Sequence, residues 1–145
     1  MSSDDCYDKA VDLLARRPHF QRELERKLSA RGFGSDEIEA ACERLTARGL
    51  LDDLEGARGL AAGAWRRRGY GPLKIRAELR RRGVADEVID TIVREGADSE
   101  VERAEEVARR WQSRSDRGRD ALARHLTGKG YSGETIYEVL SRLDS

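Results

Sequence analysis

One arrangement of apolar and polar positions occurs three times along the chain. Each copy has two apolar residues four positions apart, a glycine four positions later, and a large apolar residue directly after the glycine. Apolar residues at this spacing lie on one face of a helix, and a glycine after a helix favours the left-handed turn that reverses the chain. The repeat of about 50 residues predicts an array of helical units. The copies are Leu24/Leu28/Gly32/Phe33, Ile75/Leu79/Gly83/Val84 and Leu122/Leu126/Gly130/Tyr131.

A second apolar stripe at helical spacing follows each glycine turn, and a further helical stripe precedes each pair. We therefore predict nine helices, near residues 4–16, 19–31, 35–48, 53–68, 72–82, 86–96, 99–114, 118–129 and 133–143. The predicted fold class is all-α, with three tandem three-helix, helix-turn-helix-like repeats forming an elongated curved array. The predicted units cover residues 1–51, 52–97 and 98–145.

Polar and conformationally special residues mark the predicted helix starts. Ser35 and Ser132 are the expected N-caps of the third helix in the first and third units, whereas Ala85 is a poor cap for the second unit. Pro18 and Pro72 stand where the middle helix of a unit is expected to begin, and proline suits a first helical turn.

Three glycines interrupt the predicted helix over residues 53–68. Each interior glycine costs a helix about 0.5–1 kcal/mol relative to alanine. Two interpretations stay open: the glycines allow a close helix contact, or the helix starts late and frays. The glycines are Gly56, Gly59 and Gly63.

Composition fits helices with wide solvated faces, because 38% of the residues are hydrophobic, 39% are charged and the mean hydropathy is −0.76. The formal net charge is zero, so a globally basic nucleic-acid binder is not indicated. Charge is nevertheless uneven: from Arg58 to Arg82 the only acidic residue among many cations is Glu78. This basic stretch is either a contact surface for phosphates or carboxylates, which we favour, or an ordinary solvated face with internal ion pairs.

Candidate chemistry for catalysis is sparse. His19 and His125 fall in different predicted units, and no metal-ligand spacing, nucleophile elbow or phosphate-binding glycine loop occurs. Cys42 lies on an apolar stripe and is expected to be buried, whereas Cys6 is expected near a mobile N-terminus. We predict no enzyme activity, no metal and no cofactor. Two tryptophans on apolar stripes, Trp65 and Trp111, are expected in the core.

The first ten residues have neither the basic start nor the apolar stretch of a signal peptide. No apolar run approaches the roughly 20 residues of a membrane-spanning helix. We therefore expect a cytoplasmic protein that does not contact membranes.

The most specific stretch is Leu51-Asp52-Asp53, followed by Arg66 to Val84, which reads RRRGYGPLKIRAELRRRGV. It resembles the middle unit of the RecX family, bacterial regulators of the RecA recombinase. That unit has a Leu-Asp-Asp turn, a helix, Arg/Lys-Gly-Tyr-Gly-Pro, Ile-x-x-Glu-Leu and a Lys/Arg-Gly-Val/Ile turn. The stretch Arg16-Arg17-Pro18-His19, followed by Glu23-Leu24 and Lys27-Leu28, resembles the family's first unit. The likeness covers nearly the whole chain and is strongest at residues 49–84.

This chain departs from the family pattern in one helix. The family commonly has two phenylalanines after Leu-Asp-Asp, and Gly56 and Leu60 occupy the best-matching positions here. Loss of these aromatic anchors is expected to loosen the junction between the first and second units.

The resemblance implies a crescent of three units that lodges in the groove of the RecA–DNA filament. Family members modulate, and usually inhibit, filament growth, strand exchange, ATP hydrolysis and co-protease activity. The implied context is homologous recombination, DNA repair and the SOS response. The implied partners are the RecA filament and DNA, the latter bound weakly or through RecA, and we expect a monomer.

The predicted partner-binding residues lie in and beside the Gly-Tyr-Gly-Pro element. Tyr70 either stacks on a partner or plugs the turn between two helices. Two alternatives to RecA regulation stay open, namely a stand-alone helix-turn-helix-like DNA-binding protein and a helical scaffold for an unrelated partner. The predicted residues are Arg66, Arg67, Arg68, Tyr70, Lys74, Arg76, Arg80 and Arg81.

Overall fold

The computed structural model describes residues 3–115 and 117–144, and these contain nine α-helices, one 3₁₀ turn and no strand. The all-helical repeat fold is confirmed, with helix ends within two residues of the predicted ones. None of the helices in the described ranges is long and apolar enough to cross a membrane. The elements are α1 (Ser3–Arg16), α2 (Gln21–Ala30), α3 (Ser35–Ala47), α4 (Asp53–Arg68), α5 (Pro72–Arg81), α6 (Asp86–Gly96), η1 (Ala97–Ser99), α7 (Glu100–Arg114), α8 (Arg119–Lys129) and α9 (Gly133–Leu143).

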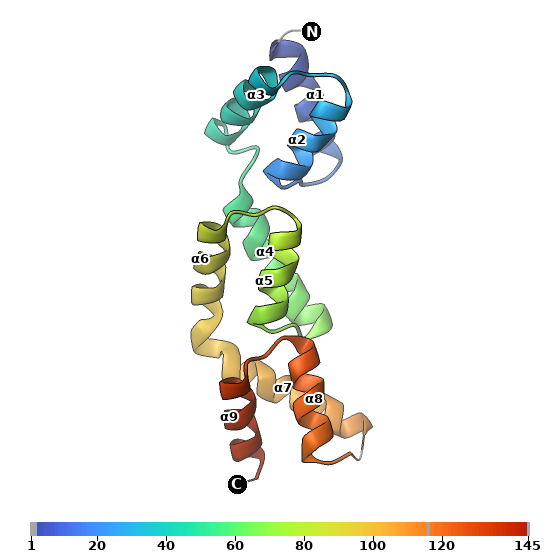
Figure 1. The fold of residues 1–145 in the computed structure, drawn as a ribbon, viewed down its shortest axis with the longest axis vertical. Coiled ribbons are helices and arrows are strands. Elements are labelled where there is room, and N and C mark those ends of the chain that lie inside the picture. The colour runs from blue at the N-terminus through green and yellow to red at the C-terminus, as the bar shows by residue number, and fades with distance from the viewer. Residues whose placement is uncertain (1–2, 116, 145) are drawn as a thin grey trace.

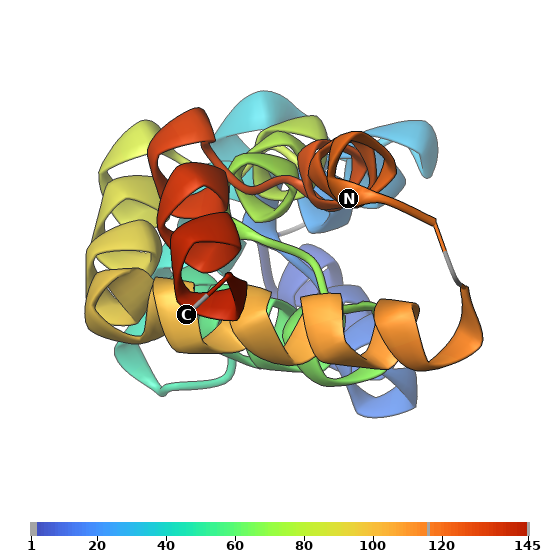
Figure 2. The same cartoon turned by 90° about the horizontal axis from the view of Figure 1, so that it is seen from below.

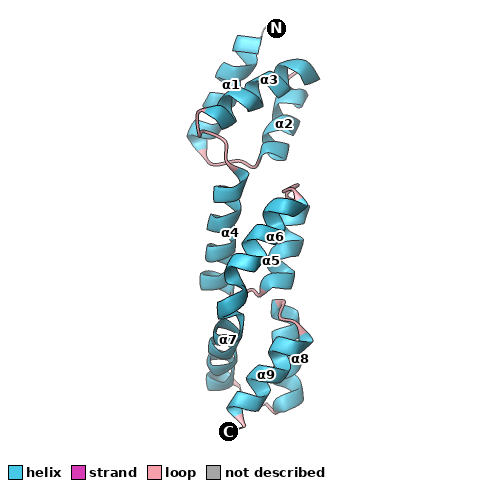
Figure 3. Ribbon diagram, turned by 90° about the vertical axis from the view of Figure 1, so that its left-hand side faces the viewer, coloured by secondary structure: helices cyan, strands magenta, loops and turns pink. Residues whose placement is uncertain are grey.

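The helices form three groups of three along one axis, with the two chain ends at opposite ends of the array (Figure 1). The middle helices α2, α5 and α8 follow one another along one edge, and α3, α6 and α9 follow the other edge. The first helices of the second and third groups, α4 and α7, lie one below the other on a third side (Figure 3). Seen along the long axis, α8 is nearly end-on and α7 crosses the array (Figure 2).

Three hydrophobic clusters follow the three groups of helices. The repeated apolar pairs lie at their centres: Leu24, Leu28, Leu79 and Leu126 are completely buried. The two tryptophans predicted in the core, Trp65 and Trp111, are only half-buried, and Trp65 packs against the cluster of the third group rather than that of its own. Burial of these stripes supplies the main stabilising free energy, since each buried leucine-sized side chain contributes about 1.5–3 kcal/mol.

The three repeated glycines adopt the predicted left-handed conformation, with φ of +93° at Gly32, +81° at Gly83 and +99° at Gly130. In each turn the residue after the glycine donates its N–H to the carbonyl of the buried leucine five positions earlier, as Val84 does to Leu79 at 3.1 Å. Only glycine adopts this conformation without strain, so each turn has the same geometry.

Several predicted helix-end details are wrong. Phe20, not Pro18, precedes α2, and its extended backbone (φ −79°, ψ 153°) sends the ring into the cluster of the second group. Gly34 is the N-cap of α3, so Ser35 is its first residue. Cys6, near the N-terminal end, is completely buried in the first hydrophobic cluster. Pro72 and Ser132 stand at their predicted places, and the Ser132 hydroxyl accepts a hydrogen bond from the Thr135 N–H.

The glycine-rich helix α4 runs without interruption from Asp53 to Arg68, so it does not start late. The Asp52 carboxylate accepts the Glu55 N–H at 3.1 Å and caps the helix. The other interpretation, that a glycine allows a close contact, applies at Gly56, because a Cβ there would lie 3.1 Å from the ring of Phe20. An aromatic ring of the first group therefore fills the space above Gly56. A Cβ on Gly59, in contrast, would meet no atom within 4 Å.

We predict opposite effects for two glycine-to-alanine changes. Gly59→Ala raises the free energy of unfolding by about 0.5–1 kcal/mol, because alanine reduces the conformational entropy of the unfolded chain and its Cβ has room in the helix. Gly130→Ala lowers the free energy of unfolding by about 1–3 kcal/mol, because φ is +99° and the new Cβ would lie 2.6 Å from the backbone nitrogen of Lys74. Urea denaturation followed by circular dichroism measures both, and equal effects would contradict this account of the turns.

Candidate functional site

The Gly-Tyr-Gly-Pro element forms the turn between α4 and α5. Gly69 ends α4 in the left-handed conformation at φ +69°, Gly71 is the extended N-cap of α5, and Pro72 is its first residue. Arg66, Arg67 and Arg68 fill the last turn of α4, where positive charge is favoured by the helix dipole.

This turn also joins the second and third groups of helices, because the end of α8 meets the start of α5 (Figure 3). The Gly71 N–H donates to the Lys129 carbonyl at 2.7 Å, and the Leu73 N–H donates to the Gly130 carbonyl at 2.9 Å. The first N–H groups and last carbonyls of a helix lack partners within it, so each helix here satisfies the other. The contact has no room for side chains, since a Cβ on Gly71 would lie 2.7 Å from the Gly130 oxygen.

Side chains reinforce the joint from both sides. The buried Tyr131 hydroxyl donates to the Gly69 carbonyl at 2.9 Å. Two ammonium groups cross in opposite directions: Lys129 donates to the Arg68 carbonyl at 2.7 Å, and Lys74 donates to the Gly128 carbonyl at 3.0 Å. Predicted site residues therefore help to hold the two groups of helices together.

Tyr70 is half-buried against the second hydrophobic cluster, and three cations surround its ring. Lys74 lies 4.7 Å from the ring centroid, and Arg68 and Lys129 each lie 5.7 Å from it. A hydrogen bond with Arg68, together with the positive charges of Lys74 and Lys129, lowers the pKa of the Tyr70 phenol. The side chain thus has the packing of a turn plug and borders a strongly positive surface.

The predicted cations of α5 other than Lys74 lie apart from the Tyr70 ring and face carboxylates. Arg76 pairs with Asp90 at 2.9 Å and Arg80 with Asp86 at 3.7 Å, both on α6. Arg81 pairs with Glu78 at 2.7 Å, and this bond lowers the pKa of Glu78. Such exposed pairs contribute little stability, so a partner's charges can replace them at small cost.

Six of the eight predicted residues fall into two sets. One set surrounds the joint, and we call it the joint cluster: Arg67, Arg68, Tyr70, Lys74 and, from the third group, Lys129. The other set is the α5–α6 face with Arg76 and Arg80. Arg66 is exposed and has no ion-pair partner among residues 3–115 and 117–144.

Lys129 was not among the predicted residues. The available signal was the repeat itself, because Lys129-Gly130 occupies the place that Arg82-Gly83 has in the second unit. The spacing gives no information on which helix end meets which helix start. The contact of Lys129 with Arg68 could therefore be found only from the structure.

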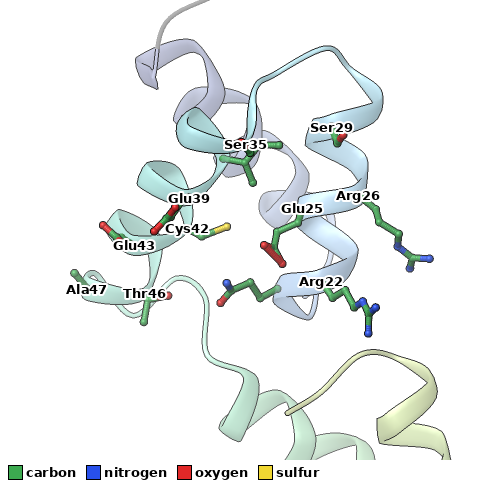
Figure 4. Close-up of a pocket in the computed structure, with 12 residues that line it drawn as sticks. Arg22, Glu25, Arg26, Ser29, Ser35, Glu39, Cys42, Glu43, Thr46 and Ala47 are labelled. Atoms are coloured by element: carbon green, nitrogen blue, oxygen red, sulfur yellow. The ribbon is translucent and has the colours of Figure 1, made fainter.

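Two further cavities lie along the array, and one of them reaches the joint cluster at Arg67, Arg68 and Tyr70. A groove of about 660 Å³ runs beside α4 from Pro18 and Leu50 to Tyr70. A second cavity of about 1000 Å³ separates α2 from α3, where Glu25 and Cys42 point into the space and Arg22 and Arg26 point away (Figure 4). Burial raises the pKa of the Cys42 thiol to about 11, so this cysteine stays protonated. The described ranges contain no cluster of three potential metal ligands.

Comparison with known proteins identifies close relatives of the whole array. The model of the first three-helix domain of RecX matches residues 6–45, and that of the second matches residues 52–92. A regulatory protein RecX from Thermus thermophilus is 43% identical over 122 residues, covering 84% of this chain and 80% of its own. One from Pseudomonas fluorescens is 41% identical over 139 residues, covering 91% and 87%.

Solved structures show the same fold. The crystal structure of RecX from Lactobacillus salivarius matches with a TM-score of 0.88 and 22% identity, covering 98% of this chain and 96% of its own. A second crystal structure, of a regulatory protein RecX, matches with a TM-score of 0.77 and 23% identity, covering 97% of this chain and 71% of its own.

We predict that Tyr131→Phe lowers the free energy of unfolding by about 1–2 kcal/mol, because the Gly69 carbonyl loses its hydroxyl donor in a buried joint. Chemical denaturation measures the change. The matched control is Tyr137→Phe, since Tyr137 is 70% exposed. Loss of its hydroxyl is expected to change the free energy of unfolding by no more than about 0.5 kcal/mol. Equal effects of the two changes would mean that this hydrogen bond does not stabilise the joint.

Proposed function

The chain belongs to the RecX family of regulatory proteins, and from this premise we propose that it regulates the RecA recombinase by binding in the groove of the RecA–DNA filament. Its relatives carry the name of regulatory proteins, so a regulatory role follows from membership. Binding to the filament, and inhibition as its result, are the parts that we propose.

The observation that carries the proposal is the elongated shape of the array (Figure 1). A filament groove is long and narrow and passes several identical subunits. Three helical groups in a row offer repeated surfaces along such a groove, as other stacked helical repeats do with extended partners. A compact domain of the same length would contact fewer subunits.

The joint between the second and third groups supports the same function. Backbone hydrogen bonds from Gly71 and Leu73 fix the relative orientation of these groups before any partner is bound. Binding of a preorganised surface loses less conformational entropy than binding of a flexible chain, so more of the contact free energy remains as affinity.

The distribution of charge supports binding to a partner that contains both protein and DNA. The α5–α6 face alternates arginine and aspartate, which suits a charged protein surface, whereas the joint cluster is almost purely cationic and suits phosphates. We expect the protein to act as a cytoplasmic monomer that inhibits filament growth, ATP hydrolysis, strand exchange and co-protease activity.

A stand-alone helix-turn-helix DNA-binding function receives less support. In such proteins the N-terminal residues of the recognition helix contact base edges. The corresponding helices here begin with acids: Asp36 and Glu37 in α3, Asp86 and Glu87 in α6, and Glu134 in α9. Their carboxylates would repel the DNA phosphates beside the groove. A stand-alone DNA-binding protein must bind duplex DNA tightly, and these charges oppose such binding.

The test is the ATPase activity of RecA on single-stranded DNA. We expect wild-type protein at stoichiometric ratios to RecA to lower the ATPase rate and strand exchange. Arg76→Gln/Arg80→Gln is expected to need about tenfold more protein for the same effect, which corresponds to a loss of about 1.4 kcal/mol of binding free energy.

The control Arg26→Gln/Arg31→Gln removes the same charge from exposed positions in and directly after α2, away from the α5–α6 face, and is expected to act like wild type. If wild-type protein leaves both RecA activities unchanged, the proposed function is wrong. If the two double variants act alike, the α5–α6 face is not the contact surface.

A further inference from the structure

A small basic pocket lies where the end of α4 meets α7 and α8. It has a volume of about 200 Å³ and combines residues of the second and third groups. Sites for drug-sized ligands occupy roughly 300–1,000 Å³, so this pocket suits a smaller group. Its lining residues are Arg67, Arg68, Gly69, Val107, Arg110, Trp111, Arg114, His125 and Lys129.

Five lining side chains are permanently cationic, and none of the described lining residues is acidic. Arg110 pairs with Glu106 at 2.8 Å on the exposed side of α7. Arg67 and Arg114 have no carboxylate partner within residues 3–115 and 117–144. In a chain whose formal net charge is zero, this local excess of unpaired positive charge favours an anionic ligand.

The floor of the pocket is rigid. The rings of Trp111 and His125 stack with centroids 5.1 Å apart and planes at 20°. Gly69 packs directly on Val107, because a Cβ there would lie 2.9 Å from a Val107 methyl group. The cations are therefore presented by packed helix ends and not by a loop, which limits the entropy lost on binding.

His125 lies within the positive potential of the pocket. Burial lowers the pKa of its imidazole, and the charges of Lys129 and Arg114 lower it further. The groups that face this ring from α7 and α8 are Trp111, Arg114 and Lys129. A bound anion would offset the two cations and raise the pKa of His125.

The cations continue beyond the pocket. Arg68 and Lys129 border the pocket and also the ring of Tyr70, which Lys74 approaches as well. The positive surface thus runs from α7 across the end of α8 to the start of α5. A linear surface of this kind fits a chain of phosphates better than one isolated ion.

We propose that this pocket binds one phosphate group of a single-stranded nucleic acid whose backbone continues over the joint cluster. The inference deepens the proposed function and rests on it for the source of the strand, since a filament groove would present DNA to this side of the array. Because the pocket exists only where α4, α7 and α8 meet, it also assigns nucleic-acid contact to the junction and not to one helical unit.

The test uses the protein without RecA, so that its failure is separate from failure of the proposed function. The chain has two histidines, His125 in the pocket and His19 in the first group. We expect a short oligothymidylate to shift the imidazole NMR signals of His125 and to raise the pKa of His125. The imidazole NMR signals of His19 are expected to stay where they are.

Arg67→Gln/Arg114→Gln is expected to weaken oligonucleotide binding about tenfold and to reduce the slope of log affinity against log salt by about 1.4, since each single-strand phosphate contact contributes roughly 0.7. The control Arg26→Gln/Arg31→Gln keeps the wild-type slope. Circular dichroism verifies the fold of each variant.

Three results would overturn the proposal. The oligonucleotide binds and leaves the His125 signals unchanged. Inorganic phosphate gives the same shift at the same concentration, which means a free-anion site. The two double variants lose equal affinity, which means that only total charge matters.

Discussion

Two backbone hydrogen bonds, from Gly71 and Leu73 to the carbonyls of Lys129 and Gly130, determine how the second and third groups of helices are placed. They connect helix ends that would otherwise need water or caps, and they align the dipoles of α8 and α5. The other contacts of the junction lie around these two bonds. Lys129 donates to the Arg68 carbonyl, the Tyr131 hydroxyl donates to the Gly69 carbonyl, and Val107 of α7 packs on Gly69 at the end of α4.

The joint between the first and second groups has a different chemistry. Phe20 packs over Gly56, the Gln21 N–H donates to the Asp53 carboxylate at 3.0 Å, and Arg22 packs over Gly83. These are side-chain contacts, and burial raises the pKa of Asp53 against the hydrogen bond from Gln21, which lowers it. Phe20 supplies an aromatic ring at the junction that the glycine-rich α4 lacks.

Periodicity was sufficient to predict the helices and the glycine turns, because these depend on residues within five positions of each other. Four of the five residues of the joint cluster were predicted, but their contact with the third group of helices was not. Arg68, Tyr70 and Lys74 belong to one motif, but Lys129 lies 61 positions after Arg68 and reaches it only through helix stacking. The partners of Arg76 and Arg80 were also hidden, since Asp90 and Asp86 reach them only after α6 folds back on α5.

The end-to-end joint is directional: the end of one middle helix meets the start of another, and the two surfaces differ. A contact of this type does not close on itself, in contrast to a two-fold interface. The start of α8 and the end of α2 lie at the two ends of the described array. Growth at either end therefore has a fixed direction, and a designed unit added beyond α8 would need a middle helix whose end fits the start of α8.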